Sequence, residues 1–86
     1  MNIDVVWKNI QLCEGETFQT VRGVSYSYVF YGDYILINDD KRRRITKEHF
    51  AKAIEIINPS SSKLSRENIW GPSYVCGMIT DKRIMP

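Results

Sequence analysis

The stretch of this sequence best suited to a chemical task is a run of four consecutive cations, Lys41 to Arg44. Arginine can bind a phosphate group through two N–H donors at once, and neutralising a nucleic-acid backbone releases counterions. The run is also consistent with a solvated hairpin end that faces the neighbouring carboxylates of Asp39 and Asp40. On the first interpretation, the predicted nucleic-acid-binding residues are Lys41, Arg42, Arg43, Arg44, Lys47, Arg66, Lys82 and Arg83.

The charges are distributed unevenly along the 86 residues, although the formal net charge is only +2. Residues 1–40 carry two cations against six carboxylates, whereas residues 41–86 carry ten cations against four carboxylates. This asymmetry can indicate a polyanionic partner. It is equally consistent with two halves of one fold that attract each other.

Four tyrosines, Tyr26, Tyr28, Tyr31 and Tyr34, form the second conspicuous set. Exposed aromatic rings on a sheet can stack on the bases of a single strand. Such rings also lie half-buried under helices or in contacts with another protein. Because residues 25–31 alternate, we expect Tyr26, Tyr28 and Phe30 to share the face that points into the core.

The sequence contains no recognisable catalytic or metal-binding motif. The one histidine, His49, lies on a predicted helix, and no nucleotide-binding or nucleophile motif accompanies it. Cys13, Cys76 and His49 lack the paired spacing of a zinc site. We expect two reduced, partly buried thiols, and the alternative is a disulfide between Cys13 and Cys76. The sequence therefore predicts a non-enzymatic protein without a metal or another cofactor.

The predicted fold is a single α+β domain over residues 1–86. It consists of an N-terminal helix, a three- to four-stranded antiparallel meander and two C-terminal helices. Asn2, Thr46 and Pro72 are typical of helix starts, and Gly-containing turns separate runs of alternating polarity. The expected elements are a helix over 2–13, strands near 17–21, 25–31, 34–38 and 42–45, and helices over 47–57 and 72–80. Residues 42–45 could instead lead directly into the following helix, and residues 59–63 are expected to form a flexible connection.

The expected core contains Trp7, Phe50, Ile54 and Val75, which fall on the apolar stripes of these helices. Phe50, Ala53, Ile54 and Ile57 form the stripe of the second helix. Gly77 indicates either close packing or a short final helix, since glycine costs about 1 kcal/mol of helix propensity. Trp70 is expected to pack beside Pro72.

The composition is that of a globular protein, with 43% hydrophobic and 26% charged residues. No apolar run approaches the roughly 20 residues of a membrane helix, and the first 12 residues lack a signal-peptide core. We therefore expect a cytoplasmic protein without membrane contact.

Three stretches share the pattern of a known family: Gly15 to Val29, Ile45 to Ala53, and Ile69 to Ile84. The elements of the pattern are Gly15-Glu16-Thr17-Phe18-Gln19-Thr20, Arg22-Gly23, Gly71-Pro72-Ser73-Tyr74-Val75 and Asp81-Lys82-Arg83-Ile84. Together they resemble a small uncharacterised domain of bacteria and mobile elements, found alone or beside DNA-handling modules. The resemblance implies a DNA-associated or phage-conflict context and brings no catalytic residues.

These observations predict a small binding module associated with nucleic acid, in which the basic run after the sheet contacts phosphates. The alternative is a protein-interaction module, either a homodimer or a small inhibitor of a larger bacterial or phage machine.

Overall fold

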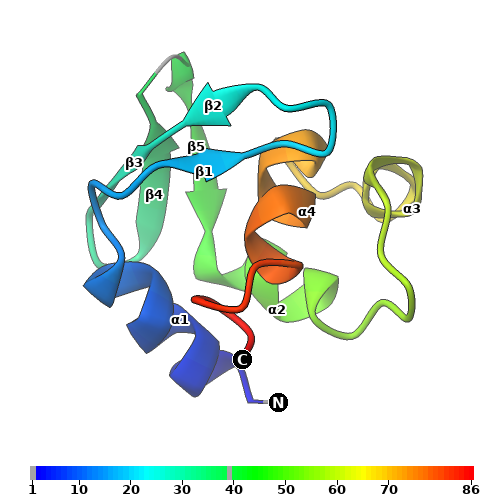
Figure 1. The fold of residues 1–86 in the computed structure, drawn as a ribbon. Helices are drawn as coiled ribbons and strands as arrows, with labels where there is room; N and C mark the ends of the chain where they lie inside the picture. Colours follow the sequence, from blue (N-terminus) through cyan, green and yellow to red (C-terminus); the bar gives the residue numbers. More distant parts are fainter. Residues whose placement is uncertain (1, 39) are drawn as a thin grey trace.

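The structure is a computed structural model that describes residues 2–38 and 40–86, excluding the side chains of residues 40–43. The α+β prediction is confirmed: a helix precedes two antiparallel sheets, and further helices follow them (Figure 1). The elements are α1 (Ile3–Leu12), β1 (Phe18–Gln19), β2 (Ser25–Tyr26), β3 (Tyr28–Phe30), β4 (Tyr34–Ile37), β5 (Asp40–Thr46), α2 (Lys47–Ala53), α3 (Ser61–Arg66) and α4 (Pro72–Ile79).

Helix α1 begins where the sequence predicts. The Asn2 side chain accepts hydrogen bonds from the backbone N–H groups of Asp4 and Val5, at 2.7 and 3.3 Å. Such a cap satisfies donors that have no partner within the helix. Trp7 is buried, as expected, and its indole N–H donates to the carbonyl of Gly32 at 2.7 Å. This bond ties α1 to the turn between β3 and β4.

The single predicted meander is divided into two sheets. Strands β1 and β2 form one antiparallel pair, and β3, β4 and β5 form a second sheet in that order. The division falls at Ser27, whose carbonyl accepts from the Asn38 N–H at 3.0 Å while its hydroxyl contacts the Asn38 amide. The predicted strand 25–31 therefore changes partners midway. Tyr26 and Tyr28 still face the core, as predicted.

Residues 42–45 belong to β5, which runs directly into α2. Thr46 caps α2 by accepting from the His49 N–H at 3.3 Å, and Phe50 is fully buried. The helix ends at Ala53, earlier than the predicted residue 57. Placing Ile57 on its apolar stripe was wrong, because the chain turns away after Ala53 and leaves Ile57 81% exposed.

The prediction of a flexible connection over 59–63 was also wrong, because helix α3 begins at Ser61. Ser60 caps it by accepting from the Lys63 N–H at 3.2 Å, and Leu64 anchors it in the core. The Lys63 ammonium donates to the carbonyls of Ile57 and Asn58 at 3.1 and 3.0 Å. In the described part of the chain, three helices therefore follow the sheets, where two were expected.

Helix α4 starts at Pro72, as predicted, and packs closely against β1. A Cβ atom added at Gly77 would lie 2.6 Å from the backbone oxygen of Gln19 and 3.0 Å from the Tyr26 hydroxyl. Of the two explanations offered for Gly77, close packing is the one observed. Trp70, expected to pack beside Pro72, is 53% exposed.

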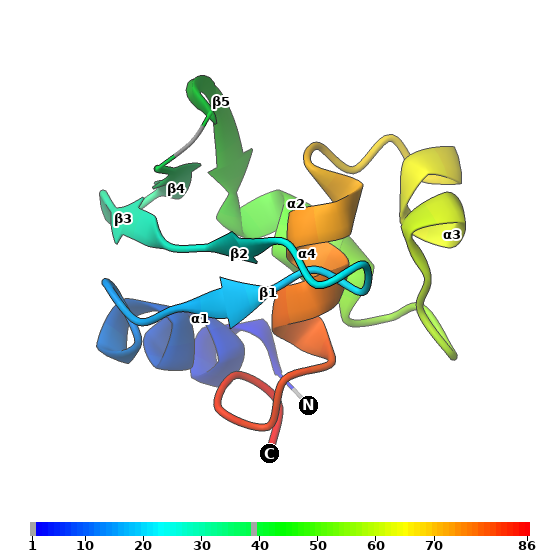
Figure 2. The ribbon, with the colours of Figure 1, turned by 45° about the horizontal axis from the view of Figure 1, so that its top comes forward.

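The core lies where α1, α2 and α4 meet the strands. Helix α2 packs against α1, α4 and β5, and α4 packs against β1. Phe50 and Val75 are buried as predicted, and Ile54 packs against this cluster while remaining half-buried. Both views place α3 beyond α4, on the side away from the three-stranded sheet (Figures 1 and 2). The outer face of that sheet is consequently left uncovered by α3.

Candidate nucleic-acid interface

The three-stranded sheet has one buried face and one face that reaches solvent. Tyr28, Ile35, Ile37 and Ile45 point inward and are at most 1% exposed. Val29, Leu36 and Arg44 are direct cross-strand partners on the opposite face. We define the outer sheet face as this row together with the tyrosines beside it: Val29, Tyr31, Tyr34, Leu36 and Arg44.

Two tyrosines and an arginine form a stack across this outer sheet face. The rings of Tyr31 and Tyr34 lie 5.2 Å apart with an interplanar angle of 16°, and the Arg44 Cζ atom lies 4.7 Å from the Tyr34 ring centre. Because β4 lies between β3 and β5, Tyr31 and Arg44 reach Tyr34 from opposite sides. The stack therefore runs across the strands, from an exposed aromatic ring to a guanidinium.

The backbone of the basic run continues from Arg44 along β5, an edge strand of this sheet. Leu36 pairs with Arg44, but the next residue, Ile37, pairs with Asp40. The pairing thus jumps over Lys41 to Arg43, which form a bulge in the edge strand. The side chains of Lys41, Arg42 and Arg43 lie outside the described residues, so only their place on the strand is established.

The other cations of the predicted set are dispersed. The Lys47 ammonium pairs with the Asp4 carboxylate at 2.7 Å, which ties the start of α2 to α1. Arg66 lies in the last turn of α3, on the far side of α4 from the outer sheet face. Lys82 is exposed after α4. The fold therefore does not bring the eight predicted residues into one patch.

Arg83 is engaged within the fold. Its guanidinium lies 3.9 Å from the centre of the Phe18 ring and donates to the Thr17 carbonyl at 3.0 Å. It also pairs with the carboxylates of Asp81 and Glu16, at 2.8 and 3.3 Å. The hydrogen bonds from Arg83 hold the pKa of Asp81 below its usual value. This clamp fastens the C-terminal segment to β1.

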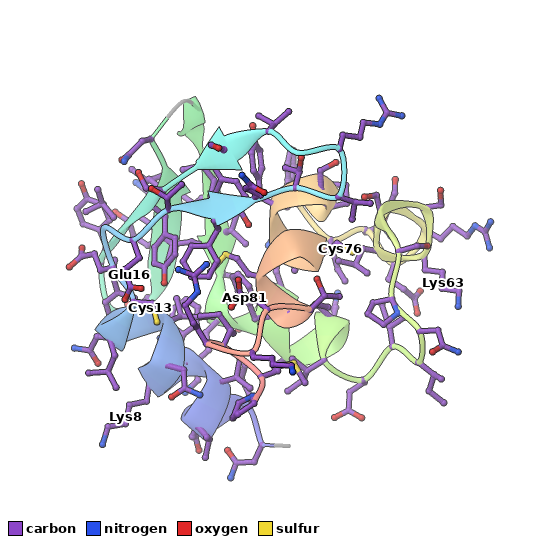
Figure 3. The ribbon with its side chains drawn as sticks, viewed as in Figure 1. Lys8, Cys13, Glu16, Lys63, Cys76 and Asp81 are labelled. Atoms are coloured by element: carbon purple, nitrogen blue, oxygen red, sulfur yellow. The ribbon has the colours of Figure 1, made fainter. Side chains whose placement is uncertain are left out.

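The two thiols show no sign of activation. Both cysteines are free and buried, in line with the prediction. Burial of Cys13, reinforced by the nearby carboxylate of Glu16, raises its pKa, and burial alone raises the pKa of Cys76. Figure 3 shows Glu16 near Cys13, whereas Cys76 lies on α4. Since the thiolate is the reactive form, neither environment favours a nucleophile.

A second surface feature is a groove of about 650 Å³ between the β1–β2 turn, the start of α3 and the side of α4. Its lining includes Thr20, Ser60 and Ser73. Val21 and Val24 also line it and are 77% and 56% exposed. Sequence reasoning missed this groove because it joins three segments that are distant in the chain.

Within residues 2–38 and 40–86, no three potential metal-binding side chains come together, and no helix has the length and apolar character needed to span a membrane. Comparisons of the chain with protein-family models, with curated proteins and with solved structures gave no match.

Proposed function

We propose that this protein is a small, non-enzymatic module that binds nucleic acid through the outer sheet face and the adjoining basic run. The observation that carries the proposal is the position of Arg44. Its guanidinium is stacked on Tyr34 at an exposed sheet edge, and three further cations precede it on the same strand. Cations and aromatic rings together are typical of surfaces that bind nucleic acid.

The local charge supports a polyanionic ligand. Residues 33–47 contain five cations against three carboxylates, and Lys47 is already paired with Asp4. An arginine held flat against an aromatic ring keeps its N–H edge available for phosphate oxygens. The bulge in β5 keeps Lys41 to Arg43 out of the regular pairing with β4. We infer that this run contacts the phosphate backbone.

The test is a binding titration with the triple variant Arg42→Ala, Arg43→Ala, Arg44→Ala, at two salt concentrations. Wild-type affinity should fall with salt, and the variant should bind more weakly to every sequence. For each phosphate that the variant no longer neutralises, the log–log salt slope should flatten by about 0.9 on a duplex or about 0.7 on a single strand. Circular dichroism should show that the variant remains folded, because Arg44 is exposed.

A matched control removes three other exposed cations, with the substitutions Lys8→Ala, Arg22→Ala and Lys52→Ala. It changes the net charge equally but leaves the outer sheet face intact. Nearly wild-type binding by this control would show that position, and not total charge, determines affinity. Equal binding by the wild type and the Arg42–Arg44 variant would refute the phosphate contacts.

The second candidate is a protein-interaction module, which the groove beside α4 favours. Val21 and Val24 line it with exposed apolar side chains, as contact surfaces for proteins often do. On this proposal the wild type binds DNA no better than micromolar even at low salt. Val21→Ser with Val24→Ser should then abolish self-association in sedimentation experiments or binding to a larger partner. Nucleic-acid binding that survives both substitutions would favour the outer sheet face.

A further inference from the structure

The stack of Tyr31, Tyr34 and Arg44 indicates which kind of nucleic acid the outer sheet face would bind. We propose that the outer sheet face binds single-stranded nucleic acid, with a base stacked on the Tyr31 ring and the following phosphates directed towards Arg44 and the basic run. This inference rests on the proposed function and narrows its ligand from nucleic acid in general to an unpaired strand.

Tyr31 has a ring surface that a base can reach. It is 53% exposed, although Tyr34 stacks against it at 5.2 Å, so much of its surface faces solvent. Tyr26 and Tyr28, in contrast, are buried, and their hydroxyls donate to the carbonyls of Tyr74 and Ile10, at 2.7 and 2.5 Å. Of these tyrosines, Tyr31 therefore offers the largest accessible ring surface for a base.

The shape of the surface suits an unpaired strand better than a duplex. In a duplex the base faces are already stacked on their neighbours, and a protein reads the base edges with an element that enters a groove. On the outer sheet face, Tyr34 covers one side of the Tyr31 ring, so an unpaired base would stack on the remaining exposed side of Tyr31, at the end of the stack. A duplex could contact the cations of β5, but its bases could not use the Tyr31 ring.

Arg44 lies close enough to Tyr31 for one short strand to reach both. The Tyr31 and Tyr34 ring centres are 5.2 Å apart, and the Arg44 Cζ atom is 4.7 Å from the Tyr34 ring centre. The distance from Tyr31 to Arg44 is therefore at most that of about three nucleotides, at roughly 3.4 Å per nucleotide of a stacked strand. A strand with one base on Tyr31 thus brings a phosphate to Arg44 within a few nucleotides. Val29 and Leu36, which lie across the same face, would contact the sugars between them.

The experiment compares a labelled oligonucleotide of about ten thymidines with its duplex, using fluorescence anisotropy at low salt. The wild type should bind the single strand more tightly. Tyr31→Leu should weaken single-strand binding by roughly 5- to 150-fold, the equivalent of about 1–3 kcal/mol per stacked base, and weaken duplex binding much less. Tyr31→Phe keeps the ring and should retain the wild-type affinity. Because stacking tolerates any base, oligoadenylate and oligocytidylate should behave similarly.

The outcomes separate this inference from the proposed function. Equal affinity for both probes, with no effect of Tyr31→Leu, would overturn the single-strand inference but leave phosphate binding standing. Binding of neither probe by the wild type would overturn both. If Tyr31→Leu converted a dimer to a monomer in sedimentation experiments without changing single-strand affinity, the face would belong to a second copy of the chain. That result would also overturn the inference.

Discussion

Replacing Gly77 with alanine should destabilise the protein, because α4 approaches β1 too closely at this residue to leave room for a side chain. The added Cβ atom would lie 2.6 Å from the Gln19 carbonyl oxygen and 3.0 Å from the Tyr26 hydroxyl. The first of these is a backbone atom in a paired strand and cannot rotate away. The second belongs to a side chain that is fixed by its hydrogen bond to the Tyr74 carbonyl at 2.7 Å.

Two effects of opposite sign determine the magnitude. Alanine is the better helix former, which alone would stabilise α4 by about 1 kcal/mol. Forcing an extra methyl group into a packed interface costs typically about 1–3 kcal/mol, and loss of the Tyr26 hydrogen bond would add about 1 kcal/mol. The net expectation is a decrease of about 1–3 kcal/mol in the free energy of unfolding. For a domain of this size, each 1 kcal/mol lowers Tm by about 4–8 °C.

Thermal and urea denaturation followed by circular dichroism would measure this decrease. Ser73→Ala is the matched control, since it places alanine in the first turn of the same helix at an exposed position. The control should change stability little. A Gly77→Ala variant that is more stable than the wild type by about 1 kcal/mol would refute the reasoning, because helix propensity would then outweigh the contact with β1.

Phe50→Ala should lower the free energy of unfolding by about 3–5 kcal/mol, because the ring is fully buried beside Trp7; near-wild-type stability in urea would contradict the packing of α2. His49 should titrate below 6.5 in NMR experiments, chiefly because burial lowers its pKa. As the pH falls, His49 therefore binds its proton at a higher pH in the unfolded chain than in the folded protein. The free energy of unfolding should thus decrease as the pH drops below about 6.5. His49→Gln should remove this decrease, and an unchanged dependence of stability on pH would contradict the prediction. Cys13 and Cys76 should react slowly with a thiol reagent at neutral pH until denaturant exposes them, because burial raises the pKa of both thiols; prompt labelling of the native protein would contradict their burial.

Features that depend on neighbours within a few residues are predictable from the amino-acid sequence alone. Asn2 and Thr46 start their helices because a side-chain oxygen reaches an N–H group two or three positions ahead. Pro72 starts α4 because its fixed φ suits the first helical position. The alternation of Tyr26 and Tyr28 indicates which of their strand faces becomes core, since successive strand residues point to opposite sides.

Two features depend on the folded chain: the change of strand partner at Ser27, and the contacts between polar groups that are distant in the sequence. The residues around Ser27 favour one continuous strand, yet its two halves pair with different neighbours, because pairing depends on distant segments. The serine-rich start of α3 has the composition of a loop, and burial of Leu64 stabilises it as a helix. Likewise, the sequence suggests that Arg83 is a free surface cation, but in the fold its guanidinium packs on Phe18 of β1 and donates to the Thr17 carbonyl.

Part of the candidate site is likewise predictable from the sequence, and part depends on the fold. Four cations are adjacent in the sequence, and this positive charge is present in any conformation. Adjacency could not show that Arg44 lies over the Tyr34 ring, or that Tyr31 stacks on the same ring. These relations depend on the register of β3, β4 and β5, which the packing of one sheet face against the helices fixes. Only the assembled sheet places Arg44 and these two rings on one surface.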